Sequence, residues 1–174
     1  MKSLYFLLLL PLNLNAEVLS SGTNGFIIQI ESQADAVPAV AYQQFINVGD
    51  WWNAEHTYYG KSENLSIDAK AGGCFCEIEG NKQVLHMTIS YVDPGSSSNS
   101  PEIRMIGGLG PLQMMGVHGG MSWQFVSVGD DQTKIIHRYQ VTGYMEGGLD
   151  KLAPIVNQVQ QLQVDKLVLQ LEAN

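Results

Sequence analysis

The sequence predicts an α+β fold in which a curved antiparallel sheet wraps around a long C-terminal helix and encloses an apolar cavity. One strand and one helix come first, about six short strands follow without a helix between them, and a long helical stretch ends the chain. Strands that follow one another in this way pair as an antiparallel meander rather than as parallel βαβ units. One helix cannot fill the whole concave face of a strongly curved sheet, so we expect an apolar cavity at one end, of the kind that binds small ligands.

The N-terminus has the pattern of a targeting segment. Lys2 precedes an apolar run from Leu4 to Leu12, and Ala16 supplies a small residue at a cleavage position. The run is far shorter than the about 20 residues of a transmembrane helix, and no Cys follows it to carry a lipid. We therefore expect residues 1–16 to be a signal peptide and residues 17–174 to be one exported domain, periplasmic or secreted. The alternative is a retained N-terminal segment of a cytosolic protein, which would leave this run exposed.

The charge balance excludes two classes of partner. The net charge is −8, and the nine Lys and Arg residues are scattered. Nucleic acids and anionic membrane surfaces both require clustered basic residues. We expect no nucleic-acid partner, no stable membrane anchor, and a monomer or weak dimer.

The first strand and helix follow from local pattern. Gly25–Gln33 is rich in β-formers, Asp35 is a suitable N-cap, and Pro38 is tolerated in a first helical turn. Gly49 ends the helix. Its apolar positions lie on one helical face; they are Val37, Val40, Ala41, Phe45 and Val48.

Six further strands are separated by glycine-rich and aspartate-rich turns. They are expected at Asn64–Asp68, Cys74–Glu79, Val84–Val92, Glu102–Ile106, Met121–Val128 and Lys134–Thr142. The final helix is expected over Leu149–Leu171. Its apolar stripe comprises Leu149, Leu152, Val156, Val159, Gln163 and Leu167, widened by Ile155, Leu162 and Leu169.

The two cysteines are two positions apart on an expected strand. Residues i and i+2 of a regular strand are about 6.6 Å apart with parallel side chains. A disulfide needs Cβ atoms about 3.5–4.5 Å apart. We therefore expect Cys74 and Cys76 to be free, buried thiols.

Two segments are candidates for the mouth of the cavity. Trp51 and Trp52 follow the first helix, where they either pack the helix onto the sheet or line the opening. Gly107–Gly116 is either a tight turn or a lid that contains the adaptable Met115. We expect the ligand-binding residues to be Trp52, Met87, Leu109, Met115, His118, Trp123, Tyr139, Leu152, Val156 and Val159.

Few residues could perform acid–base chemistry. The candidates are His86, His118, Glu77 and Tyr139. Alternation leaves open whether Glu77 faces the interior, where a carboxylate would be a plausible catalyst, or the solvent. The four histidines lack metal-ligand spacing, so we expect neither a metal nor a cofactor.

Several short segments, in this order and spacing, resemble the polyketide cyclase/dehydrase-like branch of the START-like, or SRPBCC, superfamily. The resemblance covers about Phe26 to Leu171. It implies the helix-grip fold, with a deep hydrophobic pocket between the sheet and the last helix. The segments are Trp51–Trp52, His56–Tyr58 with Gly60, Gly72–Glu77, His86–Thr88, Asp93–Gly95, Gly108–Leu112 and the helical end from Val156 to Leu167.

Fold resemblance does not fix chemistry, so three functions remain open. The leading hypothesis is an exported binding protein or carrier for a hydrophobic or aromatic small molecule. The second is a cyclase- or dehydratase-type enzyme that uses a cavity His, Tyr or Glu as acid and base. The third is a protein-interaction module of the chaperone-activator kind. An isolated cavity histidine would favour a carrier, and two titratable groups in hydrogen-bond reach beside the cavity would favour an enzyme.

Overall fold

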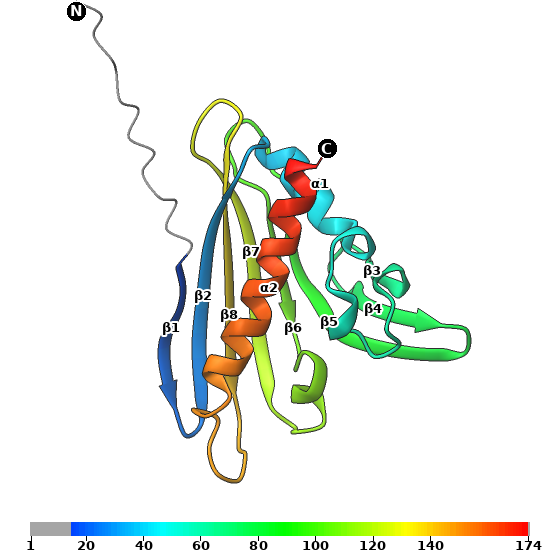
Figure 1. Cartoon of the computed structure of the whole chain (residues 1–174), viewed down its shortest axis with the longest axis vertical. Helices are drawn as coiled ribbons and strands as arrows, with labels where there is room; N and C mark the ends of the chain where they lie inside the picture. Colours follow the sequence, from blue (N-terminus) through cyan, green and yellow to red (C-terminus); the bar gives the residue numbers. More distant parts are fainter. Residues whose placement is uncertain (1–14, 174) are drawn as a thin grey trace, which may run out of the picture.

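The computed structural model describes residues 15–173 and contains one eight-stranded antiparallel sheet with two α-helices. The strand order is β1-β2-β8-β7-β6-β5-β4-β3. Figure 1 shows α2 lying across one face of the sheet, with the β4–β5 hairpin bent away from it. The strands are β1 (Asn15–Gly22), β2 (Gly25–Ala34), β3 (Leu65–Ile67), β4 (Cys74–Glu79), β5 (Lys82–Asp93), β6 (Glu102–Ile106), β7 (His118–Ser127) and β8 (Thr133–Thr142). The helices are α1 (Pro38–Ile46) and α2 (Ala153–Glu172), with 3-10 turns at Val48–Asp50, Ala54–His56, Ser62–Asn64 and Gly110–Gln113.

The predicted helix-grip architecture is confirmed, with one more strand than the expected seven. The additional strand, β1, pairs with β2 through a short turn after Gly22. It was missed because the stretch after Ala16 contains few β-branched or aromatic residues. The predicted signal peptide lies outside the described residues except for Asn15 and Ala16, which begin β1.

The core lies between the sheet and the two helices. Alternation puts Phe26, Ile28 and Ile30 of β2 on the same inner face as Ile135 and Tyr139 of β8. Helix α1 contributes Phe45 to an aromatic group with Trp51, Trp123 and Phe125, with ring centroids 4.8 to 6.1 Å apart. This cluster packs one end of the space under α2 solidly.

Two expectations about the helices are corrected. Val37, not Asp35, is the N-cap of α1, and the Asp35 carboxylate instead accepts a hydrogen bond from Gln132. Ile155, Leu162 and Leu169 do not widen the buried stripe of α2 but are exposed. The buried stripe is centred instead on Gln160, Gln163, Val164, Leu167 and Leu171.

The prediction of free thiols is wrong, because Cys74 and Cys76 form a disulfide. Strand β5 carries an extra residue opposite this pair: Phe75 pairs with Met87, but Cys76 pairs with Leu85. Such a bulge increases the local twist and bends the strands. The two cysteine Cα atoms are therefore 5.4 Å apart, within the range that a disulfide spans.

Candidate functional site

A cavity of about 910 Å³ lies between the first half of α2, the segment before β7, the loop after α1 and strands β5 and β8. Its walls are mostly apolar and aromatic. The segment Gly107–Gly116 forms the 3-10 turn Gly110–Gln113 beside this cavity, and Met114, which follows the turn, is 90% exposed. The lining residues are Trp52, Glu55, His56, Thr57, Tyr58, His86, Leu109, Gly110, Pro111, Leu112, Met114, Met115, Tyr139, Leu152, Ile155, Val156, Val159 and Gln160.

The structure brings seven of the ten predicted ligand-binding residues together around this cavity. They are Trp52, Leu109, Met115, Tyr139, Leu152, Val156 and Val159. Met87 and Trp123 face the interior but lie in the packed core. Trp123 stacks on His137 with ring centroids 4.1 Å apart, and so it is enclosed at the filled end of the sheet.

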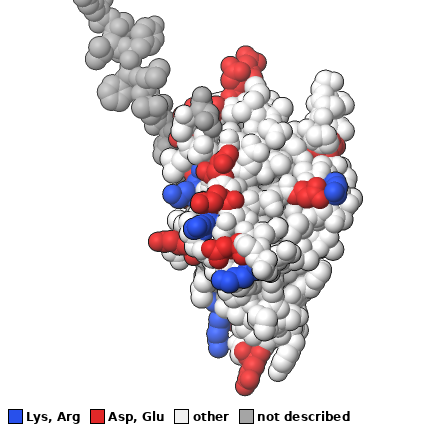
Figure 2. Space-filling model, turned by 90° about the vertical axis from the view of Figure 1, so that its right-hand side faces the viewer, with Lys and Arg blue, Asp and Glu red and all other residues white. Residues whose placement is uncertain are grey.

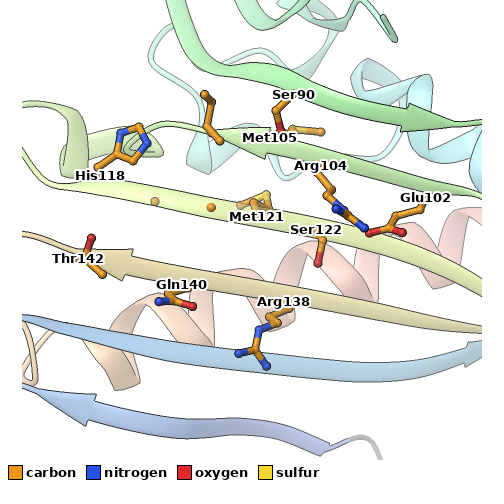
Figure 3. A pocket seen from close by; sticks show the side chains of 13 residues that line it. Ser90, Glu102, Arg104, Met105, His118, Met121, Ser122, Arg138, Gln140 and Thr142 are labelled. Carbon is orange, nitrogen blue, oxygen red and sulfur yellow. The ribbon is translucent and has the colours of Figure 1, made fainter. Parts of the chain in front are cut away.

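The prediction that His118 faces the cavity is wrong. In β7 the odd-numbered residues Met121, Trp123 and Phe125 face the core, so His118 points to the opposite side of the sheet. Figure 3 shows it at one end of a hollow on that outer face, with the ribbon of α2 behind the strands. This hollow measures about 590 Å³, and the Arg104 guanidinium at its other end is already paired with Glu102 at 2.6 Å.

Glu77 faces inward and is fully buried. Its carboxylate accepts hydrogen bonds from the backbone N–H groups of Tyr58 (2.9 Å) and Tyr59 (2.8 Å). The Nε2 atom of His86 lies 3.1 Å from the same carboxylate. Three donors therefore compensate the carboxylate for its lost hydration. Glu77 thus ties the loop after α1, at Tyr58 and Tyr59, to the sheet and also contacts His86.

His86 reaches the cavity because it is the extra residue of the β5 bulge. The bulge lets both His86 and the next residue, Met87, be buried, which regular alternation would forbid. The His86 ring lies 4.9 Å from the ring of Phe75, which limits its rotation. Burial lowers the pKa of His86 below 6.5, while the hydrogen bond and charge of Glu77 act in the opposite direction.

Gln163 fixes a second histidine at the cavity. Its Oε1 atom accepts a hydrogen bond from the Asn53 N–H at 3.0 Å, which identifies the other amide atom as the donor. That Nε2 atom lies 2.6 Å from Nδ1 of His56. Nδ1 must therefore accept, and the ring proton of His56 sits on Nε2.

The Tyr139 hydroxyl fixes the start of the Gly107–Gly116 segment to the sheet. The hydroxyl accepts from the Leu109 N–H at 3.0 Å and donates to the Gly107 carbonyl at 3.3 Å. Burial raises the pKa of Tyr139 to about 12. Gly119 permits this arrangement, because a Cβ there would come within 2.5 Å of the tyrosine ring. Tyr139 is thus a structural tether rather than a free acid.

Sequence reasoning did not select His56, Gln160 or Gln163 as site residues. Gln163 carried a usable signal, since a glutamine in an otherwise apolar helical stripe must be buried with a partner. His56 carried a weaker one, its place in the aromatic stretch after Trp52. Within residues 15–173, no group of three or more His, Cys, Asp or Glu side chains is arranged to hold a metal, and no helix could cross a membrane.

No protein-family model matches this sequence, and no curated protein matches it. Solved structures match over most of its length. The chain is similar to Ara h 8.0201, with a TM-score of 0.55 and 17% identity over 86% of this chain and 99% of that one. It is also similar to truncated norcoclaurine synthase from Thalictrum flavum, with a TM-score of 0.54 and 15% identity over 86% and 96%.

CalU16 from Micromonospora echinospora matches with a TM-score of 0.51 and 13% identity, over 90% of this chain and 82% of that one. At these identities the likeness concerns the fold. The helix-grip fold that the resemblance to the START-like superfamily implies is therefore confirmed.

Proposed function

We propose that this protein binds a neutral, apolar or aromatic small molecule between the sheet and α2. The observation that carries the proposal is the apolar cavity of about 910 Å³. Ligand sites commonly measure about 300–1,000 Å³ and are mostly apolar with a few polar groups. Each 100 Å² of apolar ligand surface removed from water contributes about 2.5 kcal/mol to binding.

The charge of the cavity supports a neutral ligand. Its walls include Glu55 and contain no Lys or Arg among the described residues. The chain as a whole carries a net charge of −8. A carboxylate or sulfonate would therefore lose its hydration without gaining an ionic partner.

The lid supports adaptable binding. Met114 and Met115 lie on a glycine-flanked turn at the opening. Methionine side chains are flexible and pack against irregular shapes. The lid is fixed through Tyr139 at one end and through Gln113, which donates to the backbone carbonyl of Leu85, at the other.

The test uses two fluorescent probes with the same aromatic skeleton. N-phenyl-1-naphthylamine is neutral, and 1-anilinonaphthalene-8-sulfonate carries a sulfonate. We expect the neutral probe to bind with micromolar affinity and the anionic probe to bind at least about tenfold more weakly, which corresponds to about 1.4 kcal/mol. Fluorescence titration measures both. Equal affinities would remove the argument for a neutral ligand.

A bulky substitution tests the location. Val156→Trp should abolish binding of the neutral probe by filling the cavity, at a stability cost of about 1–3 kcal/mol. Leu169→Trp is the matched control, because Leu169 is exposed on the same helix and does not line the cavity. If Val156→Trp remains folded by circular dichroism and binds as wild type does, the ligand does not enter this cavity.

We also propose that the protein acts outside the cytoplasm. The Lys2, Leu4–Leu12 and Ala16 pattern supports export. The Cys74–Cys76 disulfide gives independent support, because disulfides persist mainly in oxidising compartments.

A further inference from the structure

We propose that the Cys74–Cys76 disulfide is a site of reduction by a small thiol, and that its redox state sets the ligand affinity of the cavity through Phe75. This inference rests on the proposed function, because it concerns the regulation of that same cavity. The position of the disulfide, the strand register beside it and the contacts of Phe75 all support it.

The disulfide lies on the side of the sheet that faces away from the cavity. In β4, alternation buries Phe75 and Glu77 on the inner face and leaves Cys74 and Cys76 partly exposed on the outer face. A thiol can therefore approach the sulfur atoms from solvent without entering the cavity or displacing a ligand. Disulfides that solvent can reach are more readily reduced than enclosed structural ones.

The fold does not depend on this bond. The two cysteines are separated by two positions, so the disulfide closes a ring around a single residue. Closing so short a loop adds little to the free energy of unfolding. The chain should therefore remain folded when the bond is reduced, as a reversible switch requires.

Reduction removes a constraint on the β4–β5 hairpin. Residues i and i+2 of a regular strand are about 6.6 Å apart, whereas the Cα atoms of Cys74 and Cys76 are 5.4 Å apart. The register of β5 shifts opposite this pair, and His86 is the extra residue. Without the bond, β4 is free to lengthen toward the ordinary spacing at Phe75.

Phe75 carries this change to the cavity wall. It lies between the two cysteines, and its ring centroid is 5.3 Å from that of Trp52 and 4.9 Å from that of His86. Trp52 and His86 both line the cavity. Close-packed interiors transmit small displacements, so a shift of Phe75 changes the shape of this wall. The oxidised form fixes the wall in advance and should bind the ligand more tightly.

The redox step consumes two equivalents of a thiol or one of a dithiol. A thiolate attacks one Sγ atom, the S–S bond breaks, and a mixed disulfide forms while the other cysteine leaves as a thiolate. A second thiolate attacks the reductant's sulfur in the mixed disulfide and releases the first cysteine. The protein gains two electrons and two protons, and the reductant is oxidised to its own disulfide.

The first experiment measures reduction of the folded chain. Wild type is incubated with millimolar glutathione without denaturant, and free thiols are then alkylated and counted by mass spectrometry. Both cysteines should be labelled while the circular dichroism spectrum stays unchanged. Structural disulfides of exported proteins resist this reductant. Labelling that occurs only after unfolding would overturn the proposal.

The second experiment compares the affinity of the two redox forms for N-phenyl-1-naphthylamine. Reduction with dithiothreitol should weaken binding by about tenfold, which is within the usual range of coupling between sites. Cys74→Ser/Cys76→Ser is the control for the reductant: it should bind as reduced wild type does, with or without dithiothreitol. Phe75→Leu should bring the affinities of the two redox forms closer together, because it removes the ring that joins the disulfide to the wall.

Thermodynamic linkage gives a separate readout. If the oxidised form binds the probe about tenfold more tightly, saturating probe must make the disulfide about tenfold harder to reduce, a shift of about 30 mV for a two-electron couple. Equilibration in glutathione redox buffers with and without the probe measures this shift. A disulfide that braces the hairpin without affecting the cavity would show none.

The outcomes separate this inference from the proposed function. If the probe binds neither redox form, the proposed function fails. If it binds both forms with equal affinity, the cavity binds ligand but the disulfide does not regulate it, and the redox proposal is wrong. If Phe75→Leu keeps the full difference between the two forms, the route through Phe75 is wrong.

Discussion

His137 shows how burial fixes a charge state at the scale of one residue. Its ring is fully buried on the inner face of β8 and stacks on Trp123. Burial lowers the pKa of His137 to about 3, although the Ser122 backbone and the Gln160 side chain act in the opposite direction. The native protein therefore holds this ring neutral throughout the physiological range.

The expected consequence is loss of stability in acid. Below the unfolded-state pKa of about 6.5, the unfolded chain binds a proton at His137 that the native state does not bind until about pH 3. The free energy of unfolding should fall by up to about 1.4 kcal/mol per pH unit in this window. His137→Phe, which preserves the stacking, should show a shallower slope.

Urea denaturation from pH 7 to about pH 4 measures this difference. Part of the slope should remain in the variant, because the lowered pKa of His86 acts in the same direction. Equal slopes in wild type and variant would show that His137 does not govern the acid response.

Single residues also mark where sequence reasoning succeeds and fails. His118 lies an even number of residues before Ser122 and Gln124 on β7, so all three side chains share one face of the strand. Alternation alone therefore places His118 on the outer face of the sheet. Glu77 could not be placed in this way, because Phe75 on its own face and the opposite set of Cys74, Cys76 and Ile78 are both apolar. His86 could not be placed either, since its direction depends on a bulge that no local pattern encodes.

At the scale of elements, the β4–β5 hairpin connects the disulfide to the cavity wall. Phe75 lies between the two cysteines, and its ring is 5.3 Å from that of Trp52 and 4.9 Å from that of His86. Glu77 follows Cys76 directly and accepts hydrogen bonds from the N–H groups of Tyr58 and Tyr59, in the loop after α1. The disulfide therefore braces the part of the sheet that positions both aromatic and polar wall residues.

Removing the disulfide should have a local rather than a global effect. Stabilisation by a disulfide grows with the length of the loop it closes, and this loop is minimal. Cys74→Ser/Cys76→Ser should therefore cost about 2 kcal/mol or less. The double variant should nevertheless speed amide hydrogen exchange at Tyr58 and Tyr59, because their N–H groups donate hydrogen bonds to the Glu77 carboxylate beside the disulfide.

Hydrogen-exchange mass spectrometry of the double variant measures this effect, with exchange in the distant β2–β8 pair as the internal reference. Thiol labelling of unfolded wild type without reductant should count no free thiols. A count of two would contradict the disulfide, and unchanged exchange at Tyr58 and Tyr59 would contradict its bracing role.

Whole elements were predicted better than their exposed faces. Hydrophobic periodicity predicted β7, β8 and α2. All three were predicted near their observed bounds. Leu162 and Leu169 were assigned to the buried stripe because hydrophobic periodicity shows which residues of a helix are apolar. It does not show which side of the helix faces the sheet. That orientation depends on buried Gln160 and Gln163, whose partners lie far away in sequence.

At the scale of the molecule, the sequence predicted the cavity beside Leu152, Val156 and Val159, but it did not predict that Trp123 would lie in the packed core. Phe45, Trp51 and Trp123 fill one end of the concave face. The open space is lined from the helix side by Leu152, Val156 and Val159. The enclosed position of Trp123 therefore results from the packing of three large rings, which is a tertiary property.

The N-terminal edge of the sheet gives the last prediction, that the mature chain begins at Glu17. Cleavage after Ala16 would remove two register pairs, Asn15 with Glu31 and Ala16 with Ile30. The pairs from Glu17 to Gly22 would remain, so β1 would still cover β2. Chain ends at a sheet edge tolerate such trimming because few buried groups lose partners.

N-terminal sequencing of the exported protein should therefore start at Glu17. A chain of residues 17–174 should bind N-phenyl-1-naphthylamine as the natural mature protein does, because none of the residues lining the cavity belongs to β1. Recovery of residues 2–10 on the protein from its native compartment would contradict export with cleavage. Misfolding of the 17–174 chain would instead show that the first two residues of β1 are needed to hold the edge strand, so the two results separate processing from stability.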